Sequence, residues 1–410
     1  MTTTIIATQG HGKATGRLDG LYRVLATLAA AARTDHQGPR PRCLAEGDKK
    51  RGSTMQPRPS VKALFILFHT RLSALALTLA LGALAASGAH GAQPGAIDVH
   101  SAPRWLVDDG RSVSALLADG RIVSLRGGAP ATRATQFSPE APLHACFDAL
   151  VGIGKDGALI TIDALDQVSP SAPGLLSLQG GIACGQAAIW GISADGDVLR
   201  FEHRARRWVE VKRVSAQALP DARIVRFDLA GNGDAKLFVL AEGSSTRYRH
   251  GVLGDAIEPT ALLMIDPHSL AVEARLSLPA PMVFEDLLPR PLSLAARPGL
   301  ALVSASPQGG AALALVGIEQ GRLEIVASGP DFGEPSRWLN PLVGPTSLYA
   351  VLTPHIGGML YGYTRHGREL SPMPLATGVS THRIGSRQLE GAAVVTRPGG
   401  RALLLLPSQS

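Results

Sequence analysis

The chain has 410 residues, of which 45% are hydrophobic but only 4% aromatic, and its formal net charge is +7. The positive charge lies at the start, because residues 1–92 hold 12 Lys or Arg against 4 Asp or Glu, whereas residues 93–410 hold 28 against 29. A near-neutral body excludes binding to nucleic acid, which requires a basic surface.

Residues 55–92 have the order of a secretory signal peptide. A basic stretch that starts at Met55 precedes the uncharged run from Leu72 to Ala86, and small residues follow up to Ala92. Two alternatives stay open, namely a buried helix and an uncleaved membrane anchor over residues 61–86. We therefore expect a periplasmic or secreted protein, with no membrane contact unless the signal segment is retained.

Residues 1–54 are rich in Thr, Gly, Ala and Arg. They are predicted to be a disordered extension, or to be untranslated if Met55 is the true start. A signal peptide acts at an N-terminus, which favours Met55. The folded domain is expected to span residues 93–410.

Cys146 and Cys184 are the two cysteines that follow the signal segment. An oxidising compartment favours a disulfide between them. They lie 10 residues before Asp156 and 11 residues before Asp195, so they occupy equivalent places in successive repeats. The sequence leaves open whether they pair or remain as two buried thiols.

Turn signals recur at a spacing near 40 residues. Gly120, Gly157, Gly196 and Gly233 lie 37, 39 and 37 residues apart, and each precedes a strand-like run. Asp-Gly between apolar alternations is a strong hairpin signal. A period of this length built from hairpins is typical of a four-stranded propeller blade. Because the body also lacks helical periodicity, we predict an all-β fold.

The second half continues the pattern with looser spacing. A hairpin is predicted over residues 261–278, and further strands over 300–327 and 347–373. Only two strands, at residues 392–396 and 402–406, remain at the end, so Ile97 to Val107 is predicted to complete the last blade. The expected fold is a single, monomeric β-propeller of about seven four-stranded blades.

Five motifs occur in a recognisable order in the second half: Tyr248 to Pro259, Val283 to Asp286, Arg337 to Pro341, Thr353 to Gly358 and His382 to Ser386. In this order they resemble exported bacterial proteins with FG-GAP or VCBS-type repeats, over about residues 220–410. The resemblance implies a propeller of the integrin α-chain kind, and no activity can be carried over with it.

In that family, turns of the type Asp-x-Asp-Gly-Asp-Gly-x-x-Asp bind Ca²⁺. Only residues 228–236 approach this pattern, with Asp228, Asn232 and Asp234 as candidate ligands. Ala230 and Lys236 stand where acidic residues are expected, and Ca²⁺ requires about six to eight oxygen ligands. We therefore expect no cofactor beyond, at most, a single calcium ion at this turn.

The sequence contains no His-Glu-x-x-His, no Gly-x-Ser-x-Gly, no phosphate-binding glycine loop and no zinc-spaced Cys/His cluster. Glu258, Glu285 and Asp286 flank an insertion and would serve as general acids or bases if they met in a pocket. Capping of strand ends and loops is the simpler interpretation of these carboxylates.

Polar and aromatic residues gather in the last three motifs, where His355 and His382 take matched loop positions 27 residues apart. Loops on one face of a propeller commonly bind ligands, and Trp beside Arg is typical of an interaction hot spot. The alternative is structural, with histidines bonded to neighbouring loops and a tryptophan wedged between blades. The candidate binding residues are Arg337, Trp338, Asn340, His355, His382 and Arg383.

Two function classes follow. The first is an exported, non-catalytic binding or scaffold protein whose propeller face recognises a protein, peptide or glycan. The second is a periplasmic propeller enzyme, quinoprotein-like or hydrolytic, with a site at the central channel. Such an enzyme needs a cofactor-stacking Trp or convergent ionisable groups, and the 4 Trp residues are widely scattered, which favours the binding protein.

Overall fold

The computed structural model describes residues 4–8, 99–108, 112–126, 129–396 and 402–407. The chain divides into two units, residues 1–30 with 97–410, and residues 31–96. The predicted signal peptide at residues 55–92 lies outside the described residues, and so does the extension at 1–54 apart from Thr4–Thr8. Within the described ranges, no helix is long and apolar enough to span a bilayer.

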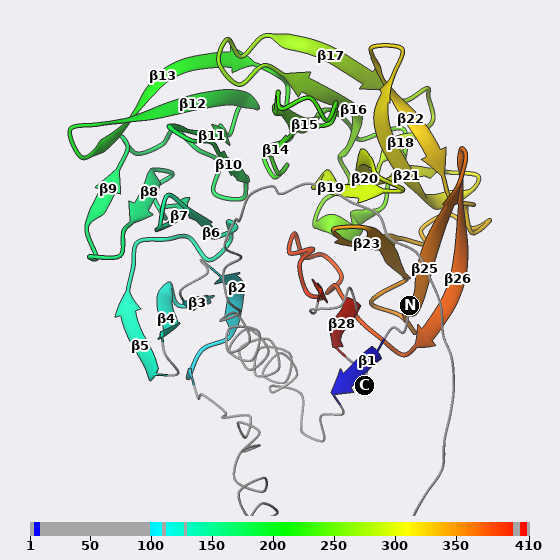
Figure 1. The fold of residues 1–410 in the computed structure, drawn as a ribbon, viewed down its shortest axis with the longest axis horizontal. Helices are drawn as coiled ribbons and strands as arrows, with labels where there is room; N and C mark the ends of the chain where they lie inside the picture. The colour runs from blue at the N-terminus through cyan, green and yellow to red at the C-terminus, as the bar shows by residue number, and fades with distance from the viewer. Residues whose placement is uncertain (1–3, 9–98, 109–111, 127–128, 397–401, 408–410) are drawn as a thin grey trace, which may run out of the picture. The chain divides into compact units, whose positions relative to one another are not determined.

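The first unit is a β-propeller, so the predicted fold class is confirmed. Its strands form six sheets, and the nine-stranded sheet consists of two blades that one parallel bridge joins, between Ser328 and Glu369. This gives seven blades, which follow one another in chain order (Figure 1). Val, Leu, Ile and Ala make up most of the buried core, and in β11 (Ala188–Ile192), which reads AIWGI, every residue is buried.

Blades 1 to 4 each contain four antiparallel strands. Blade 1 consists of β2 (Pro103–Asp108), β3 (Val113–Leu117), β4 (Arg121–Arg126) and β5 (Ala129–Ala134). Blade 2 consists of β6 (His144–Cys146), β7 (Ala149–Ile153), β8 (Leu159–Ile162) and β9 (Val168–Pro170). Blade 3 consists of β10 (Ile182–Cys184), β11, β12 (Asp197–Arg204) and β13 (Arg207–Ser215). Blade 4 consists of β14 (Val225–Phe227), β15 (Lys236–Ser244), β16 (Glu258–Ile265) and β17 (Val272–Ser277), with the short 3₁₀ helix η1 (Gly251–Leu253) in its insertion.

Blades 5 to 7 are less regular. Blade 5 consists of β18 (Val283–Phe284), β19 (Arg290–Leu294), β20 (Arg297–Ser306), β21 (Gly310–Glu319) and β22 (Arg322–Ser328). Blade 6 consists of β23 (Leu339–Gly344), β24 (Ser347–Leu352), β25 (Met359–His366) and β26 (Glu369–Thr377). Blade 7 consists of β27 (Ala393–Thr396), β28 (Ala402–Pro407) and β1 (Thr4–Thr8).

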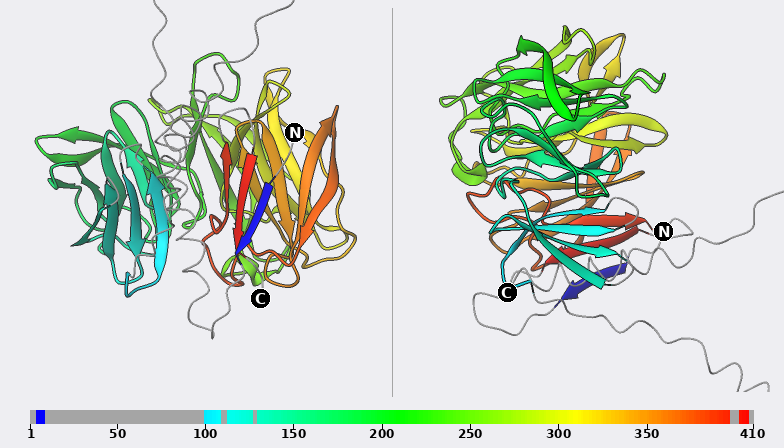
Figure 2. Two further views of the ribbon diagram at one scale, coloured as in Figure 1. Left: turned by 60° about the horizontal axis from the view of Figure 1, so that its bottom comes forward. Right: turned by 90° about the vertical axis from the view of Figure 1, so that its left-hand side faces the viewer.

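The prediction that Ile97 to Val107 completes the last blade is wrong. Strand β2 pairs with β3 as the first strand of blade 1. A hairpin within one blade closes a short loop, which costs less chain entropy than pairing with the distant C-terminal strands. Strand β28 pairs instead with β1, in parallel, and Figure 2 shows these two strands side by side.

Three of the four predicted turns occupy equivalent positions, between the second and third strands of blades 1, 2 and 3. Gly120, Gly157 and Gly196 have φ of 86°, 77° and 81° there, a conformation that glycine adopts at little cost. Gly233 differs, because its turn joins β14 to β15, the first two strands of blade 4. The insertion between β15 and β16 takes the equivalent place in that blade, so the spacing of 37 residues does not mark a fourth equivalent turn.

Each tryptophan links neighbouring blades through its indole N–H. Trp105 donates to the carbonyl of Pro139 and Trp190 to that of Pro267, both at 2.9 Å. Trp208 of β13 donates at 3.0 Å to Oγ1 of Thr161 in blade 2. The indoles therefore both fill the apolar space between blades and satisfy polar groups there.

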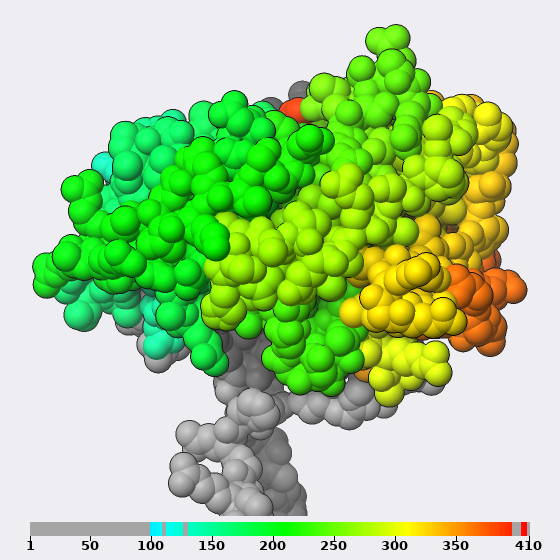
Figure 3. Space-filling model, turned by 90° about the horizontal axis from the view of Figure 1, so that it is seen from above, coloured from blue at the N-terminus to red at the C-terminus, as the bar shows by residue number. Residues whose placement is uncertain are grey.

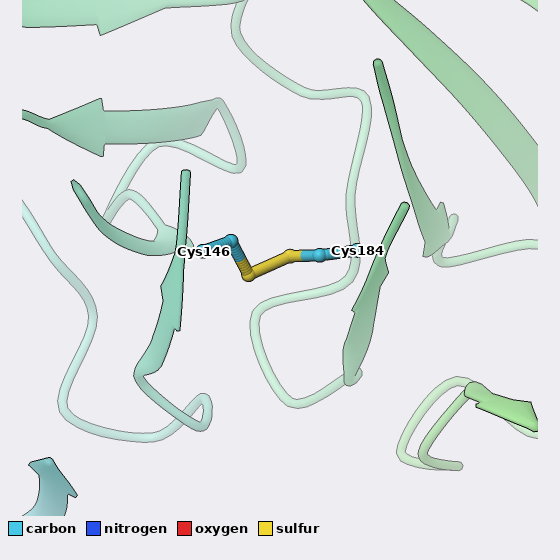
Figure 4. The surroundings of a disulfide bond; sticks show 2 residues. All are labelled: Cys146 and Cys184. Atoms are coloured by element: carbon cyan, nitrogen blue, oxygen red, sulfur yellow. A yellow bond between two sulfur atoms is a disulfide. The ribbon is translucent and has the colours of Figure 1, made fainter. Parts of the chain in front are cut away.

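Cys146 and Cys184 are joined by a disulfide, with their Cα atoms 6.3 Å apart (Figure 4). The bond links β6 and β10, the first strands of blades 2 and 3. On the outside of the molecule, the fourth strands of neighbouring blades also approach one another, as β17 and β22 do. Figure 3 shows blades 3 to 5 as a continuous surface.

Candidate functional site

Two kinds of connection lie at the same end of the blades, because the strands are antiparallel. These are the turns between second and third strands and the connections from each fourth strand to the next blade. We call this end the connection face. It carries the blade 4 insertion (residues 245–257), the β24–β25 loop (residues 353–358) and the segment between β26 and β27.

The segment at residues 378–392, here called the central segment, is bound by several blades and lies inside the arc of sheets in Figure 1. Gly385 N–H donates to the carbonyl of Val252 in the blade 4 insertion at 2.9 Å. Gln388 Nε2 donates to the carbonyl of Arg104 in β2. The segment thus connects blades that are far apart in the sequence.

Arg387 anchors the centre of this segment. Its Nε donates to Asp221 Oδ2 and its Nη2 to Asp255 Oδ2, each at 2.7 Å. Its own carbonyl accepts a hydrogen bond from Nη2 of the buried Arg223 at 3.1 Å. Because two carboxylates compensate its charge, Arg387 is a structural cation.

Asn340 ties the same segment to blade 6. This fully buried amide donates from Nδ2 to Thr381 Oγ1 and to the carbonyl of Leu389, both at 3.0 Å. Its Oδ1 accepts from Arg290 Nη2 at 3.4 Å, and Arg290 Nη1 contacts both carboxylate oxygens of Asp286, at 3.0 and 2.8 Å. Asn340 therefore holds the central segment in place from inside the protein.

Trp338 and two histidines pack together beside this network. The ring of His382 meets Trp338 edge-on at a centroid distance of 4.5 Å, and the ring of His355 lies 6.3 Å from that of His382. Nε2–H of His382 donates to the carbonyl of Ser386 at 2.7 Å. Burial lowers the pKa of His382 to about 4, so its imidazole is neutral at pH 7.

Glu285 lies behind Trp338 and is completely buried. Its Oε1 contacts Nδ1 of His250 from the blade 4 insertion. Burial raises the pKa of Glu285 well above its ordinary value, with a further contribution from Asp286, and burial lowers the pKa of His250. Both directions favour a neutral pair in which the protonated carboxyl donates to the imidazole.

Three atoms of this cluster are buried without a hydrogen-bond partner among the described residues, namely Glu285 Oε2, His355 Nδ1 and His382 Nδ1. Glu258, also buried, starts β16 nearby; burial raises its pKa to about 10, and the charges of Glu285 and Asp255 add to the shift. Buried polar groups are normally paired, so such a concentration distinguishes this place from the rest of the core.

A pocket of about 240 Å³ opens beside the central segment. Three of its eight lining residues are arginines, and Glu140 is the acidic member. The lining residues are Arg104, Glu140, Gln179, Arg383, Ile384, Gly385, Ser386 and Arg387.

The six candidate binding residues thus separate into two groups. Arg383 is exposed and lines the pocket, and Arg337 is exposed and pairs with Glu334 at 3.0 Å. The other four contribute to packing on or beneath the connection face; Trp338 and Asn340 are fully buried, His382 is buried and His355 is half-buried.

Several residues of the site carried no local signal in the sequence. Arg104, Glu140 and Gln179 come from blade 1 and from connections far from the motifs. Arg387 follows Ser386 directly, so extending the last motif by one residue would have included it. Arg223, whose guanidinium lies 5.8 Å from the Trp105 ring, is not adjacent to any of the five motifs in the sequence.

At the candidate calcium turn, protein groups already engage the oxygens. Asp228 accepts hydrogen bonds from the N–H groups of Gly231, Asn232 and Gly233 at 2.7, 3.2 and 2.6 Å. Asn232 Oδ1 accepts from Asp234 N–H at 3.0 Å, and Asp234 Oδ2 lies 2.9 Å from the ammonium of Lys236. In the described ranges, no three His, Cys, Asp or Glu side chains are placed to hold a metal ion.

No protein-family model matches the chain, and no curated protein matches it. Among solved structures, it is similar to BamB from Moraxella catarrhalis, with a TM-score of 0.45 and 12% identity over 76% of this chain and 84% of that chain. It is also similar to a chain of the mitotic checkpoint complex, with a TM-score of 0.46 and 10% identity over 73% of this chain and 82% of that chain. The site is therefore interpreted from its own residues.

Proposed function

We propose that this chain is an exported, monomeric binding protein, and that the pocket beside the central segment receives part of a protein, peptide or glycan. The observation that supports this most is that hydrogen bonds from several blades hold the central segment in place. Blade 1, the blade 4 insertion and blade 6 all hydrogen-bond it, while Arg383 and Ile384 remain exposed at the pocket. A preorganised segment loses little conformational entropy when it binds a partner.

Export is supported by two features of the chain. The order of residues 55–92 is that of a signal peptide. The disulfide between Cys146 and Cys184 suits an oxidising compartment. The proposal therefore places the propeller of residues 93–410 in the periplasm or outside the cell, and cleavage after the signal segment would leave blade 7 with β27 and β28 but without β1. Membership among propellers with FG-GAP or VCBS-type repeats belongs to the same proposal and rests on the motif order alone.

Blocking the pocket tests the binding function. Gln179→Trp fills the pocket, whereas Leu178→Trp adds the same group at an exposed neighbour outside it. With a library of hexapeptides and a set of oligosaccharides as probes, we expect at least one to bind the wild type and Leu178→Trp equally and Gln179→Trp at least tenfold more weakly. Absence of binding, or equal binding to all three proteins, would overturn the proposal.

One observation favours the enzyme as a second candidate. Glu285, His355 and His382 bring together three buried polar atoms that have no hydrogen-bond partner in the part of the chain that the structure describes, and perturbed groups of this kind are common in active sites. Mass spectrometry of a bound probe after incubation separates the two functions. A binding protein returns the probe unchanged, whereas an enzyme yields a new mass that Glu285→Gln abolishes.

A further inference from the structure

Blade 7 depends on a strand from the start of the chain. Strand β28 pairs with β27 along one edge and with β1 along the other, the latter in parallel. No other described strand pairs with that second edge. Because β1 precedes the signal segment at residues 55–92, the cleavage that accompanies export removes it. The exported protein then keeps β28 with one edge open.

The open edge of β28 lacks the features that protect most sheet edges. The strand reads Ala-Leu-Leu-Leu-Leu-Pro, without a charged residue, and its one proline stands at its end. Natural edge strands are commonly short, charged or interrupted by proline, because unpaired N–H and C=O groups otherwise pair with strands of other chains. Without β1, strand β28 is therefore a template for the addition of a strand.

Both faces of β28 are apolar. Leu404 and Leu406 are buried in a cluster with apolar residues of blade 6. Leu403 and Leu405 lie on the opposite face, since side chains alternate along a strand, and in the part of the chain that the structure describes their cluster contains only residues of blade 7. A strand added beside β28 would thus extend apolar surface on both of its faces.

Strand β1 shows which sequence this edge accepts in the whole chain. It reads Thr-Ile-Ile-Ala-Thr, which is uncharged and β-branched except at Ala7. Residues of this kind fit a pleated, half-buried surface. A second copy of the chain would offer its own β28, which is rich in leucine and ends in proline, so the sequence that occupies the edge favours a different protein as the donor.

From this arrangement we propose that the exported protein accepts at β28 an extended segment of another exported protein, uncharged and rich in Ile, Val and Thr, in the place that β1 takes in the whole chain. This inference rests on the export that the proposed function includes, and it adds an interaction surface separate from the pocket. Backbone hydrogen bonds along the edge give such a complex its affinity, and side chains give it specificity. The added strand also restores a third strand to blade 7, because two strands alone are marginally stable.

Fluorescence anisotropy with a strand peptide tests the proposal. The probe is the labelled hexapeptide Thr-Thr-Ile-Ile-Ala-Thr, which has the sequence of residues 3–8. Two samples present the open edge, namely the whole chain with Ile5→Pro/Ile6→Pro, where proline breaks the pairing of β1, and the processed protein secreted from a gene that starts at Met55. We expect both to bind the probe. The wild-type whole chain and Ile5→Val/Ile6→Val keep β1 in place and should bind it about tenfold more weakly or less.

Altered probes and one variant define where and what the edge binds. Thr-Thr-Pro-Pro-Ala-Thr lacks two N–H groups of the ladder, and Thr-Thr-Lys-Glu-Ala-Thr brings charges beside the leucines, so both should bind about tenfold more weakly or less. Gln179→Trp in the Ile5→Pro/Ile6→Pro chain fills the pocket, and binding of the probe that persists there occurs outside the pocket. The probe should also raise the melting temperature of the processed protein.

Three results would overturn the inference in distinguishable ways. If neither sample with an open edge binds the probe, or if the wild-type whole chain binds it equally well, β28 accepts no added strand, and the pocket function is unaffected. If these samples form dimers in sedimentation velocity, the occupant is a second copy and the proposed partner is wrong. If the protein is not secreted, or if N-terminal sequencing of the secreted protein still finds residues 4–8, the proposed export falls and the inference falls with it.

Discussion

Trp338 donates a hydrogen bond from Nε1 to the backbone carbonyl of Glu285 at 2.9 Å, across the boundary between blades 6 and 5. The same ring supports His382 on the central segment. One side chain thus joins two blades and the candidate site. A residue that reads as a surface hot spot in the sequence is instead completely buried in the structure.

Trp338→Phe should lower the free energy of unfolding by about 1–3 kcal/mol, because the buried carbonyl of Glu285 loses its donor. Chemical denaturation at pH 7 measures the change. Arg337→Ala, at the exposed adjacent position, is the control and should stay within about 0.5 kcal/mol of the wild type. Equal losses in the two variants would contradict the assigned role.

Gly196→Ala should be far more destabilising than Gly233→Ala. Both glycines have positive φ, 81° and 88°, so both variants carry the strain of that conformation, about 1–2 kcal/mol. A Cβ on Gly196 would also lie 2.4 Å from the carbonyl oxygen of Ala218, whereas one on Gly233 would meet nothing within 4 Å. The clash should add about 1–3 kcal/mol.

The two unfolding curves check this prediction, since the conformational cost is common to both variants. If Gly196→Ala and Gly233→Ala unfold at the same denaturant concentration, the connection to blade 4 does not pack on the Gly196 turn as the structure has it.

The features that were predicted correctly from the sequence are those that depend on short-range signals. The turns at Gly120, Gly157 and Gly196, and the hairpin formed by β16 and β17, depend on neighbouring residues, and blade number followed from their spacing. The place of Gly233 was predicted wrongly, because a spacing of 37 residues does not report which two strands a turn joins. The pairing of β28 was predicted wrongly, because a strand from the chain start leaves no local trace.

The site was predictable only in part for the same reason. His382 and Arg383 were found because the last motif is compact. Their setting depends on contacts that span long stretches of chain, such as Arg387 to Asp221 over 166 residues and Gln388 to Arg104 over 284 residues. Periodicity and spacing cannot report which distant residues share a pocket. Only the folded structure shows that Arg104, Glu140 and Gln179 line it.

Loss of the disulfide should destabilise the propeller substantially. The bond closes a loop between residues 38 apart in sequence, and the chain-entropy model gives about 4 kcal/mol for a loop of this size. Cys146→Ser/Cys184→Ser should therefore melt at a lower temperature than the oxidised wild type. A reducing agent should shift the wild type toward the double variant and leave the double variant itself unchanged; a shift in both would point to another cause.

Acid should destabilise the protein through His382. Its pKa is about 4 in the folded state because of burial, below the ordinary value near 6.5 in the unfolded chain. The unfolded state then binds the additional proton between pH 6.5 and 4, so this contribution to stability is present above that window and lost as the pH falls through it.

His382→Gln should remove this contribution, which amounts to a slope of about 1.4 kcal/mol per pH unit within the window. Denaturation midpoints measured from pH 7 to pH 4 test it. Trp338→Phe serves as the control, because it removes a neighbouring contact but no titrating group. An acid slope in His382→Gln as steep as in the wild type would refute the assignment.

Glu258 should make the protein less stable as the pH rises, the opposite of the effect of His382. Burial raises its pKa to about 10, whereas the unfolded value is near 4.3. The folded state therefore retains a proton that the unfolded state releases, and the stability from this group is full below the unfolded value and is lost as the pH rises toward 10. Glu258→Gln keeps a neutral side chain at every pH, so it should gain stability over the wild type progressively between pH 5 and pH 9.

Asp266→Asn is the matched control for Glu258→Gln. Backbone and side-chain hydrogen bonds from Ser269 and the ammonium of Lys236 hold the pKa of Asp266 below its ordinary value, so its carboxylate is ionised in both states over this range. Its effect on stability should be a constant offset from pH 5 to pH 9. If the difference between Glu258→Gln and the wild type were equally constant, Glu258 would be ionised in the folded protein, and its burial beside Glu285 would have to be compensated by a cation.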